Sequence, residues 1–167
     1  FNEANIVVIL LDNGTLGNTG LQPTGCTGTN VVGRDVPRVD LAGLCRSMGV
    51  PFVKRVRPLQ AEEMTDAILE ALDAPKPAIL VAEEPCVLNR LHAEKAQRLL
   101  KRTAAVDAKK CSRCGKCMEL FCSAISWPGY REKGNATKPI ISTALCTACG
   151  LCVEVCPEGA IQIAEVE

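Results

Sequence analysis

The sequence lacks the features that mark a membrane protein or a nucleic-acid-binding protein. Its longest apolar runs, such as Ile6 to Leu11 and Ala78 to Ala82, fall far short of the roughly 20 residues that a membrane-spanning helix needs. Its 19 basic residues balance its 19 acidic residues, so no net charge attracts nucleic acid or an anionic membrane surface. We therefore expect no membrane and no nucleic acid among its partners.

The sequence also lacks a signal peptide, because no basic and then apolar segment precedes the first apolar run. It begins at Phe1 without a methionine, which indicates a fragment of a longer chain. Cysteine, in contrast, is abundant. Eight of the 11 cysteines lie in tight groups near the C-terminus, whereas a disulfide framework would spread them. This grouping indicates metal binding in a reducing compartment, so we expect a cytoplasmic protein.

Strand-like and helix-like segments alternate through about the first ninety residues. The predicted strands are Ile6–Leu11, Pro51–Val56 and Ala78–Ala82. The predicted helices are Asp40–Met48 and Ala61–Leu72, and Asp40 is expected to cap the first of them. In the second helix, one face is predicted to carry the apolar residues Met64, Ile68, Leu69 and Leu72. This alternation is typical of an α/β fold, in which helices cover a parallel sheet.

A loop rich in Gly, Thr and Asn follows the first strand and runs from Asp12 to Gly33. It is too long for a simple connection, and long loops of this kind usually carry function. We interpret it as a binding loop. Taken alone, its opening residues, Asp12-Asn13-Gly14-Thr15, favour a turn.

A basic segment connects the α/β part to the cysteine-rich part. Residues 89–106 are rich in Ala, Lys, Arg and Leu, and we predict a basic helical linker there. A solvated surface position is expected for its charged residues and for the single histidine, which are Lys95, Arg98, Lys101, Arg102 and His92. The chain is thus predicted to hold an α/β domain at residues 1–88, this linker, and a cysteine-rich domain at residues 107–167.

The cysteine-rich part holds two similar segments, which indicates an internal duplication. The first run consists of Cys111, Cys114, Cys117 and Cys122, and the second consists of Cys146, Cys149, Cys152 and Cys156, followed by Pro157. Three thiols at three-residue intervals turn toward one compact centre, as a 4Fe-4S cluster requires. A structural zinc site needs two separated pairs and no third cysteine, and thiols this dense leave no sensible disulfide pairing. The sequence therefore predicts two 4Fe-4S clusters.

Residues Ala105 to Ile163 resemble the two-cluster bacterial ferredoxin domain, a small α+β fold. In that family the fourth cysteine of each run ligates the other cluster. The resemblance therefore implies one cluster on Cys111, Cys114, Cys117 and Cys156, and a second cluster on Cys146, Cys149, Cys152 and Cys122. The first run departs from the family pattern, because four residues instead of three precede Cys122 and because Ser123 stands in place of a proline.

Several residues beside the thiols are candidates for tuning the clusters. Gly115 and Gly150 would let main-chain amides approach the cluster sulfurs. A cluster held by four thiolates is negatively charged, and a group of basic residues that would offset this charge consists of Lys109, Lys110, Arg113 and Lys116. The same group could dock an acidic electron carrier.

The N-terminal part carries a second resemblance, which rests on three motifs. The motifs are Asp12-Asn13-Gly14-Thr15 at the strand end, Thr19-Gly20-Leu21-Gln22-Pro23-Thr24-Gly25 in the loop, and Glu84-Pro85-Cys86 at the close of the α/β unit. With the cysteine-rich domain that follows, this order resembles the 2-oxoacid:ferredoxin oxidoreductase family, most closely its indolepyruvate-oxidising alpha subunits. The resemblance covers essentially the whole chain and implies part of a thiamine-diphosphate-binding domain.

The resemblance also implies cofactor-binding residues. Asn13 matches an asparagine that binds the Mg²⁺ of thiamine diphosphate, the backbone carbonyl of Thr15 matches a further ligand, and Gly14 and Gly20 would let the backbone approach the diphosphate. No Gly-Asp-Gly motif precedes Asn13, and Leu21 stands where the closest relatives often have a histidine. We assign no catalytic residue and expect this part of the chain not to be catalytic by itself.

The three remaining cysteines lack the spacing of cluster ligands. Cys45 and Cys86 are expected to be small buried apolar residues. Cys26 lies in the loop after the first strand and is a weaker candidate for lining the cofactor site.

The activity implied by the resemblance is the oxidative decarboxylation of indolepyruvate or another arylpyruvate. Coenzyme A would accept the acyl group, and electrons would pass through the two clusters to an external ferredoxin. The implied partners are a beta/gamma-type subunit and a second alpha chain. Two alternatives stay open: a pure electron-transfer subunit whose α/β part is a docking platform, and a non-oxidative thiamine decarboxylase, which would not need two clusters.

Overall fold

The computed structural model describes residues 4–87, 89, 102–129 and 137–165. The chain divides into two compact units, Phe1–Arg90 and Leu91–Glu167. Each unit has its own sheet structure and its own buried core. We therefore describe the two units separately.

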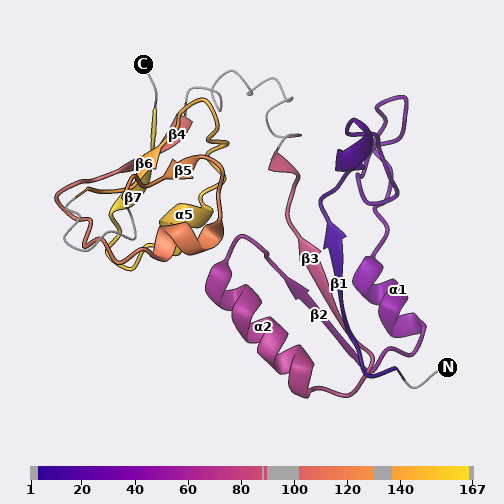
Figure 1. The fold of residues 1–167 in the computed structure, drawn as a ribbon. Coiled ribbons are helices and arrows are strands. Elements are labelled where there is room, and N and C mark those ends of the chain that lie inside the picture. The colour runs from indigo at the N-terminus through magenta and orange to yellow at the C-terminus, as the bar shows by residue number, and fades with distance from the viewer. Residues whose placement is uncertain (1–3, 88, 90–101, 130–136, 166–167) are drawn as a thin grey trace. The chain divides into compact units, whose positions relative to one another are not determined.

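The first unit is built on a parallel sheet of three strands in the order β1-β3-β2. The strands are β1 (Val7–Asp12), β2 (Phe52–Val56) and β3 (Ala78–Glu83). Two helices, α1 (Leu41–Ser47) and α2 (Ala61–Asp73), connect them and lie on opposite sides of the sheet (Figure 1). This is the arrangement that right-handed connections between parallel strands produce, and the predicted α/β fold is confirmed.

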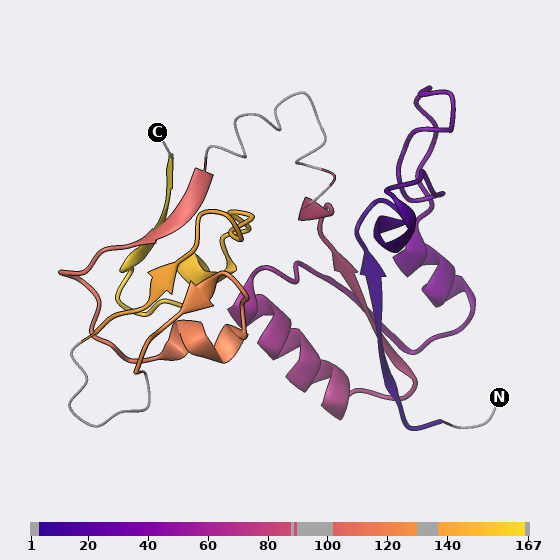
Figure 2. The same cartoon turned by 45° about the horizontal axis from the view of Figure 1, so that its top comes forward.

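The register of the sheet brings acidic residues together at its carboxyl end. Asp12, the last residue of β1, pairs with Glu83, the last residue of β3, and Val56 of β2 pairs with Ala82. The long loop that follows Asp12 starts from this end, passes through a short 3-10 helix, η1 (Gly17–Thr19), and returns to α1 (Figure 2). In open parallel sheets this end is where ligands bind.

The core of the first unit lies between α2 and the sheet. Ala67 and Ala71 of α2 are fully buried against the sheet, together with Leu80 and other strand residues. Of the four residues predicted to share one apolar face, Met64 and Ile68 pack against this core, whereas Leu69 and Leu72 are each 57% exposed. Met64, Ala67, Ile68 and Ala71 have the helical spacing of a buried stripe, and the two alanines let the helix lie close to the strands.

The start of α1 follows the predicted signal, and a glycine ends the helix. The Asp40 carboxylate accepts a hydrogen bond from the main-chain N–H of Gly43 at 2.8 Å, which makes Asp40 the N-cap. After the helix, Gly49 has a φ of +82°, a left-handed conformation that glycine adopts without strain.

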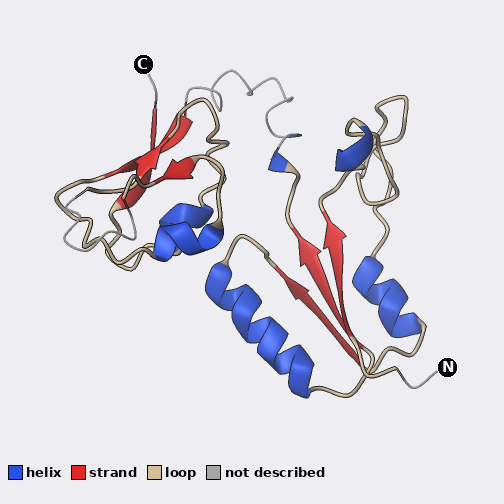
Figure 3. Ribbon diagram, in the orientation of Figure 1, coloured by secondary structure: helices blue, strands red, loops and turns tan. Residues whose placement is uncertain are grey.

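The second unit is a small α+β fold made of short strands. Strand β4 (Arg102–Val106) pairs antiparallel with β7 (Ile161–Glu165), and β5 (Ile125–Ser126) pairs antiparallel with β6 (Ile140–Ile141). A 3-10 helix, η2 (Lys116–Leu120), and a short helix, α5 (Leu151–Glu154), lie in the two cysteine runs (Figure 3). Cys117 and Cys152 are buried in its core beside Ala104, Ile125 and Ile161.

Strand β4 corrects the predicted linker. The helix predicted for residues 89–106 is wrong at Arg102–Val106, because these residues form an extended strand paired with β7. Their Ala-rich composition favours a helix locally, but pairing with a distant strand overrides this preference. The remaining linker residues, apart from Asn89, lie outside the described residues, and so do His92, Lys95, Arg98 and Lys101. No helix among the described residues is long and apolar enough to cross a membrane.

Candidate cluster and cofactor sites

The first cavity of the second unit is lined by four cysteines that come from both runs. They are Cys111, Cys114 and Cys117 of the first run and Cys156 of the second. The wall between these thiols includes Val106, Ile161 and Trp127, which are largely apolar side chains. The structure thus brings together the four thiols predicted for one cluster.

The second cavity is lined by the other four cysteines of the two runs. Cys146, Cys149 and Cys152 come from the second run, and Cys122 comes from the first. Leu120, Ile125, Ile141 and Leu145 supply apolar side chains around them. Four sulfur donors around an apolar cavity fit the donor set of a 4Fe-4S cluster, and both cavities have this composition.

The pKa values of two buried thiols reflect this grouping. Burial raises the pKa of Cys117, and nearby Cys111, Cys114 and Cys156 raise it further. Burial likewise raises the pKa of Cys152 to about 11, with further contributions from Cys149, Cys146 and Cys122. Ligation must displace protons from these thiols, since the thiolate is the form that binds metal.

The two runs share an unusual backbone at the same places. Arg113 and Ala148, each directly before the second cysteine of its run, have φ values of +65° and +51°. Gly115 and Gly150, each directly after that cysteine, have φ values of +83° and +89°. Repeated left-handed residues turn the chain tightly at these cysteines, and at Ala148 the main-chain N–H lies 3.4 Å from the Cys146 sulfur. The duplication seen in the sequence is therefore also a duplication of conformation.

The extra residue of the first run is accommodated at Phe121. This residue adopts a φ of +50° at the end of η2, and its side chain is 94% exposed. The second run uses one turn of α5 over the equivalent stretch, without such a residue. The longer spacing therefore turns Phe121 outward while Cys122 still lines the second cavity.

Hydrogen bonds reach the sulfurs from residues that the sequence did not single out. The main-chain N–H groups of Ala104 and Ala148 lie 3.3 and 3.4 Å from the Cys146 sulfur, and the N–H of Ala160 lies 3.3 Å from the Cys156 sulfur. Gly115 and Gly150 have a left-handed backbone in these turns. Ala104 could not be found from the sequence, because it belongs to the segment that was interpreted as linker.

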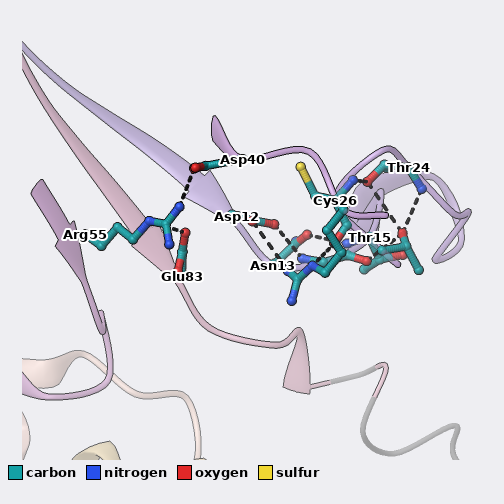
Figure 4. A network of polar contacts seen from close by, with 11 residues as sticks. Asp12, Asn13, Thr15, Thr24, Cys26, Asp40, Arg55 and Glu83 are labelled. Atoms are coloured by element: carbon teal, nitrogen blue, oxygen red, sulfur yellow. Dashed lines mark hydrogen bonds and ion pairs between the residues drawn. The ribbon is translucent and has the colours of Figure 1, made fainter. Parts of the chain in front are cut away.

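The predicted cofactor loop begins with two consecutive side-chain turns. The Asp12 carboxylate accepts a hydrogen bond from the N–H of Gly14, and the Asn13 side-chain oxygen accepts one from the N–H of Thr15, both at 3.0 Å (Figure 4). The Thr15 hydroxyl donates to the carbonyl of Gln22 at 3.0 Å, and Thr15 is buried. The turn favoured by the sequence is therefore present, and it holds Asn13 and Thr15 next to each other.

Glycines keep this loop compact. Gly14 has a φ of +72° with open space around its α-carbon, and Gly20, with a φ of +104°, ends η1. A Cβ at Gly17 would lie 3.3 Å from the Asn13 side-chain nitrogen. The loop thus approaches Asn13 closely at Gly17 and leaves space beside Gly14, where a diphosphate could approach the backbone.

Arg38 contacts both the start of the loop, at Asp12, and a later part of it, at Cys26. Its guanidinium lies 3.6 Å from the buried Asp12 carboxylate, and its Nε donates to the carbonyl of Cys26 at 2.7 Å. The Thr27 hydroxyl donates to the carbonyl of Gly14 at 2.8 Å. These contacts hold residues 26 and 27 over the start of the loop. Sequence reasoning missed Arg38, because nothing in its local sequence indicates which carboxylate it pairs with.

A second arginine, Arg55 near the carboxyl end of β2, forms ion pairs with two acidic residues. Arg55 pairs with Asp40 at the start of α1, and its Nε lies 3.3 Å from Glu83 at the end of β3 (Figure 4). The hydrogen bond from Gly43 lowers the pKa of Asp40, and the nearby Arg55 lowers it further. Arg38 and Arg55 both line one cavity together with Asp12 and Glu83.

The three other cysteines have different surroundings. Cys45 is buried, with 2% of its surface exposed, as predicted for a small apolar residue. Cys86 is only partly buried, and its sulfur would lie 3.7 Å from a Cβ at Gly17, beside the cofactor loop. Burial raises the pKa of Cys26, and the Asp12 carboxylate raises it further.

The loop residues fit part of a magnesium site. Mg²⁺ prefers hard oxygen donors and is commonly held by few protein groups together with phosphate oxygens. The side-chain oxygen of Asn13 and the main-chain carbonyl of Thr15 are donors of this kind, and the Asn13 turn holds the two residues together. The described residues thus supply a partial donor set at the carboxyl end of the sheet.

Two family models match the chain. The thiamine pyrophosphate enzyme, C-terminal TPP binding domain matches residues 1–82, and the 4Fe-4S binding domain matches residues 139–162. Fold and sites together therefore define a protein that joins a thiamine diphosphate binding region to an iron-sulfur region.

Curated relatives are similar to nearly the whole chain. The indolepyruvate oxidoreductase subunit IorA of Methanothermobacter marburgensis is 32% identical over 96% of this chain and 24% of its own length. The same subunit of Archaeoglobus fulgidus is 31% identical over 99% of this chain and 25% of its own. The chain thus spans about a quarter of the length of these relatives. The chain is thus IorA-like over nearly its whole length, as its motifs predicted.

Proposed function

We propose that this chain forms the electron-exit part and one portion of the thiamine diphosphate site in a 2-oxoacid:ferredoxin oxidoreductase subunit. The observation that carries the proposal is the division of eight cysteines between two cavities, with each set drawn from both runs. Such a pair of sites serves electron transfer, and in the same chain Asn13 and Thr15 form a turn suited to a metal-bound diphosphate.

The first cluster is held by Cys111, Cys114, Cys117 and Cys156, and the second by Cys146, Cys149, Cys152 and Cys122. The lining of the two cavities supports this assignment. Cys156, the fourth cysteine of the second run, lines the cavity of the first run, and Cys122, the fourth cysteine of the first run, lines the cavity of the second. The runs cannot then separate without breaking both clusters, so cluster binding also stabilises the fold of this unit.

Thiamine diphosphate supplies the nucleophile and the electron sink for decarboxylation when it is bound. The Asn13 side-chain oxygen and the Thr15 carbonyl would hold its Mg²⁺, and Gly14 and Gly20 would let the backbone approach the diphosphate. Arg38 holds the other side of the loop through Asp12 and the Cys26 carbonyl, which keeps Asn13 in place before the cofactor arrives.

The substrate of the complete enzyme is indolepyruvate or another arylpyruvate, and coenzyme A takes the acyl group. When bound, the two clusters would carry the two electrons of the reaction, one at a time, to an external ferredoxin. A beta/gamma-type partner subunit and a second alpha chain complete the assembly, which works in the cytoplasm. The names of the IorA relatives support the substrate class.

The test compares Asn13→Ala with Asn18→Ala in the full-length protein co-purified with its partner subunit. Asn18 is an exposed asparagine of the same loop and serves as the matched control. Asn13→Ala should lose most of its Mg²⁺-dependent thiamine diphosphate binding in calorimetry and its 2-oxoacid-dependent ferredoxin reduction, while its iron content stays unchanged. Asn18→Ala should match the wild type in all three measurements.

The alternative functions predict other results. A pure electron-transfer subunit would show two clusters but no thiamine diphosphate binding in the wild type. A non-oxidative decarboxylase would release carbon dioxide without reducing ferredoxin. Unchanged cofactor affinity in Asn13→Ala would remove Asn13 from the metal site.

A further inference from the structure

The two cysteine runs are similar in backbone but differ in charge. Four basic residues of the first run, which we call the basic surface, are Lys109, Lys110, Arg113 and Lys116. The residues at the equivalent places of the second run are Ala144, Leu145, Ala148 and Leu151. All four basic residues are exposed to solvent. The second run thus has no basic residue where the first run has four.

The fold of the runs does not require these charges. Before the first cysteine of the first run, the N–H of Cys111 donates to the carbonyl of Asp107 at 3.0 Å. At the same place in the second run, the N–H of Cys146 donates to the carbonyl of Ser142, also at 3.0 Å. The left-handed residues described above recur in both runs as well. The same turns therefore form with and without basic side chains.

Compensation of cluster charge does not explain the difference either. Two clusters that are each held by four thiolates carry the same charge, so residues that only offset it would be expected in both runs. An acidic residue does recur, because Glu119 of the first run corresponds to Glu154 of the second. Lys116 lies 3.2 Å from Glu119. The basic residues that form no ion pair within the described part of the chain are Lys109, Lys110 and Arg113.

The basic surface lies where the first set of thiols approaches solvent. Cys114 is the exposed thiol of this set, and Arg113 directly precedes it. Arg113 and Lys116 line the first cavity, together with one acidic residue, Glu158. Within the described part of the chain, no charged side chain lines the second cavity. A protein bound to the basic surface would therefore come close to the first cluster and not to the second.

Exposed charges of one sign act mainly on the approach of a partner. They contribute little to the stability of the fold, because solvent screens them. They do increase the rate at which an oppositely charged protein binds, and they orient it. Electron-transfer complexes are weak and bury little surface, so a few charged residues beside the redox centre suit such a partner.

We propose that the basic surface docks an acidic one-electron carrier, and that electrons leave this protein from the cluster on Cys111, Cys114, Cys117 and Cys156. The inference rests on the proposed function and names the cluster from which electrons leave. In the transfer step, one electron passes from this cluster to the carrier. The cluster is oxidised, the carrier is reduced, and no bond forms or breaks.

The experiment is a stopped-flow measurement of electron transfer from the full-length protein to an oxidised ferredoxin with an acidic surface. The protein is purified anaerobically with its partner subunit and reduced photochemically beforehand. The first variant, Lys109→Gln with Lys110→Gln, removes two positive charges that do not line the first cavity. The matched control, Thr143→Glu with Ala144→Glu, adds two negative charges at exposed places of the second run that do not line its cavity. Both variants therefore change the net charge equally.

The lysine variant should transfer electrons more slowly. Its second-order rate constant should fall about tenfold at low ionic strength and approach the wild-type value in about 0.5 M salt, where exposed charges are screened. The control variant should stay within about twofold of the wild type. Transfer to methyl viologen, a small cationic acceptor, should not slow in either variant, and iron content and reduction potentials should stay unchanged.

Three results would overturn the proposal. They are an unchanged rate constant in the lysine variant, an equal fall in both variants, and a fall confined to the control variant, which would place the exit at the second cluster. If the lysine variant loses iron, Lys110→Gln alone is compared with Ala144→Glu alone, and the same outcomes decide.

Failure of the proposed function would look different. Transfer from photochemically reduced protein needs neither thiamine diphosphate nor a 2-oxoacid, so it tests the docking surface by itself. A wild-type protein without two 4Fe-4S signals, or without 2-oxoacid-dependent reduction of ferredoxin, would overturn the proposed function whatever the effect of the lysines. The two failures are therefore distinguishable.

Discussion

Cys122, the last cysteine of the first run, lines the same cavity as Cys152 of the second run, and it adds to the burial that raises the pKa of Cys152 to about 11. In the same way, Cys156 of the second run adds to the burial that raises the pKa of Cys117 in the first run. Each run therefore places its fourth thiol in the cavity of the other. This exchange leads to a test of which cysteine serves which cluster.

We expect Cys122→Ser to damage the second cluster, although Cys122 belongs to the first run. Its electron paramagnetic resonance spectrum and iron content should match those of Cys149→Ser rather than those of Cys114→Ser. Cys156→Ser should match Cys114→Ser for the same reason. A spectrum of Cys122→Ser that matches Cys114→Ser would show that each run serves its own cluster.

Arg38→Gln should weaken binding of thiamine diphosphate with Mg²⁺ about fivefold. The substitution removes the ion pair with Asp12 and the hydrogen bond to Cys26, but Arg38 is 59% exposed, so solvent screens much of the effect. Calorimetric titration of the full-length protein measures the change. Arg34→Gln, a change of another exposed arginine in the same loop, should leave the affinity unaltered. Equal affinities for the two variants would refute the role given to Arg38.

Gly14→Ala and Gly33→Ala form a matched pair. Both glycines have positive φ, at +72° and +77°, and open space around the α-carbon, so each alanine should cost about 1 kcal/mol of stability through backbone strain alone. Only Gly14→Ala should also weaken binding of thiamine diphosphate, because Gly14 lies between the residues proposed to hold its metal. Urea unfolding and calorimetry separate the two effects. A similar loss of affinity in Gly33→Ala would contradict this placement.

Phe121→Gly should stabilise the cluster-loaded protein by about 1 kcal/mol. The left-handed conformation of Phe121 strains any residue with a Cβ, and the exposed ring contributes little packing in return. Phe121→Ala removes the ring but keeps the strain, so it should leave stability nearly unchanged. Anaerobic thermal unfolding compares the two variants. A destabilised Phe121→Gly would mean that the ring is covered by a partner or by another part of the protein.

The stability of the first unit should depend on pH through Asp40. The hydrogen bond from Gly43 and the nearby Arg55 lower the pKa of this carboxylate in the folded state. Its contribution is therefore present above the usual carboxyl pKa and is lost as the pH falls through the lowered value. Asp40→Asn should flatten the acid limb of the stability profile, measured by urea unfolding, whereas Asp66→Asn on the exposed surface of α2 should not. Parallel profiles for wild type and Asp40→Asn would contradict this.

Local patterns were enough to predict much of the fold. The strands of the sheet, the cap at Asp40 and the turn at Asn13 and Thr15 follow from short-range spacing, and the structure places them within one or two residues of the prediction. The burial of α2 was harder to predict. Apolar content favoured Leu69 and Leu72, but contact with the sheet selected the smaller Ala67 and Ala71, because side-chain size limits how closely a helix approaches strands.

By itself, the sequence determined the chemistry of this protein, since three-residue cysteine spacing, left-handed glycines and an asparagine turn depend only on neighbouring residues. Tertiary structure decided which distant groups meet. It paired β4 with β7 and so placed Ala104 beside Cys146, and it brought Arg38 to Asp12. Patterns in a single sequence do not predict these long-range contacts. The packing of the whole unit selects which distant residues form a hydrogen bond or an ion pair.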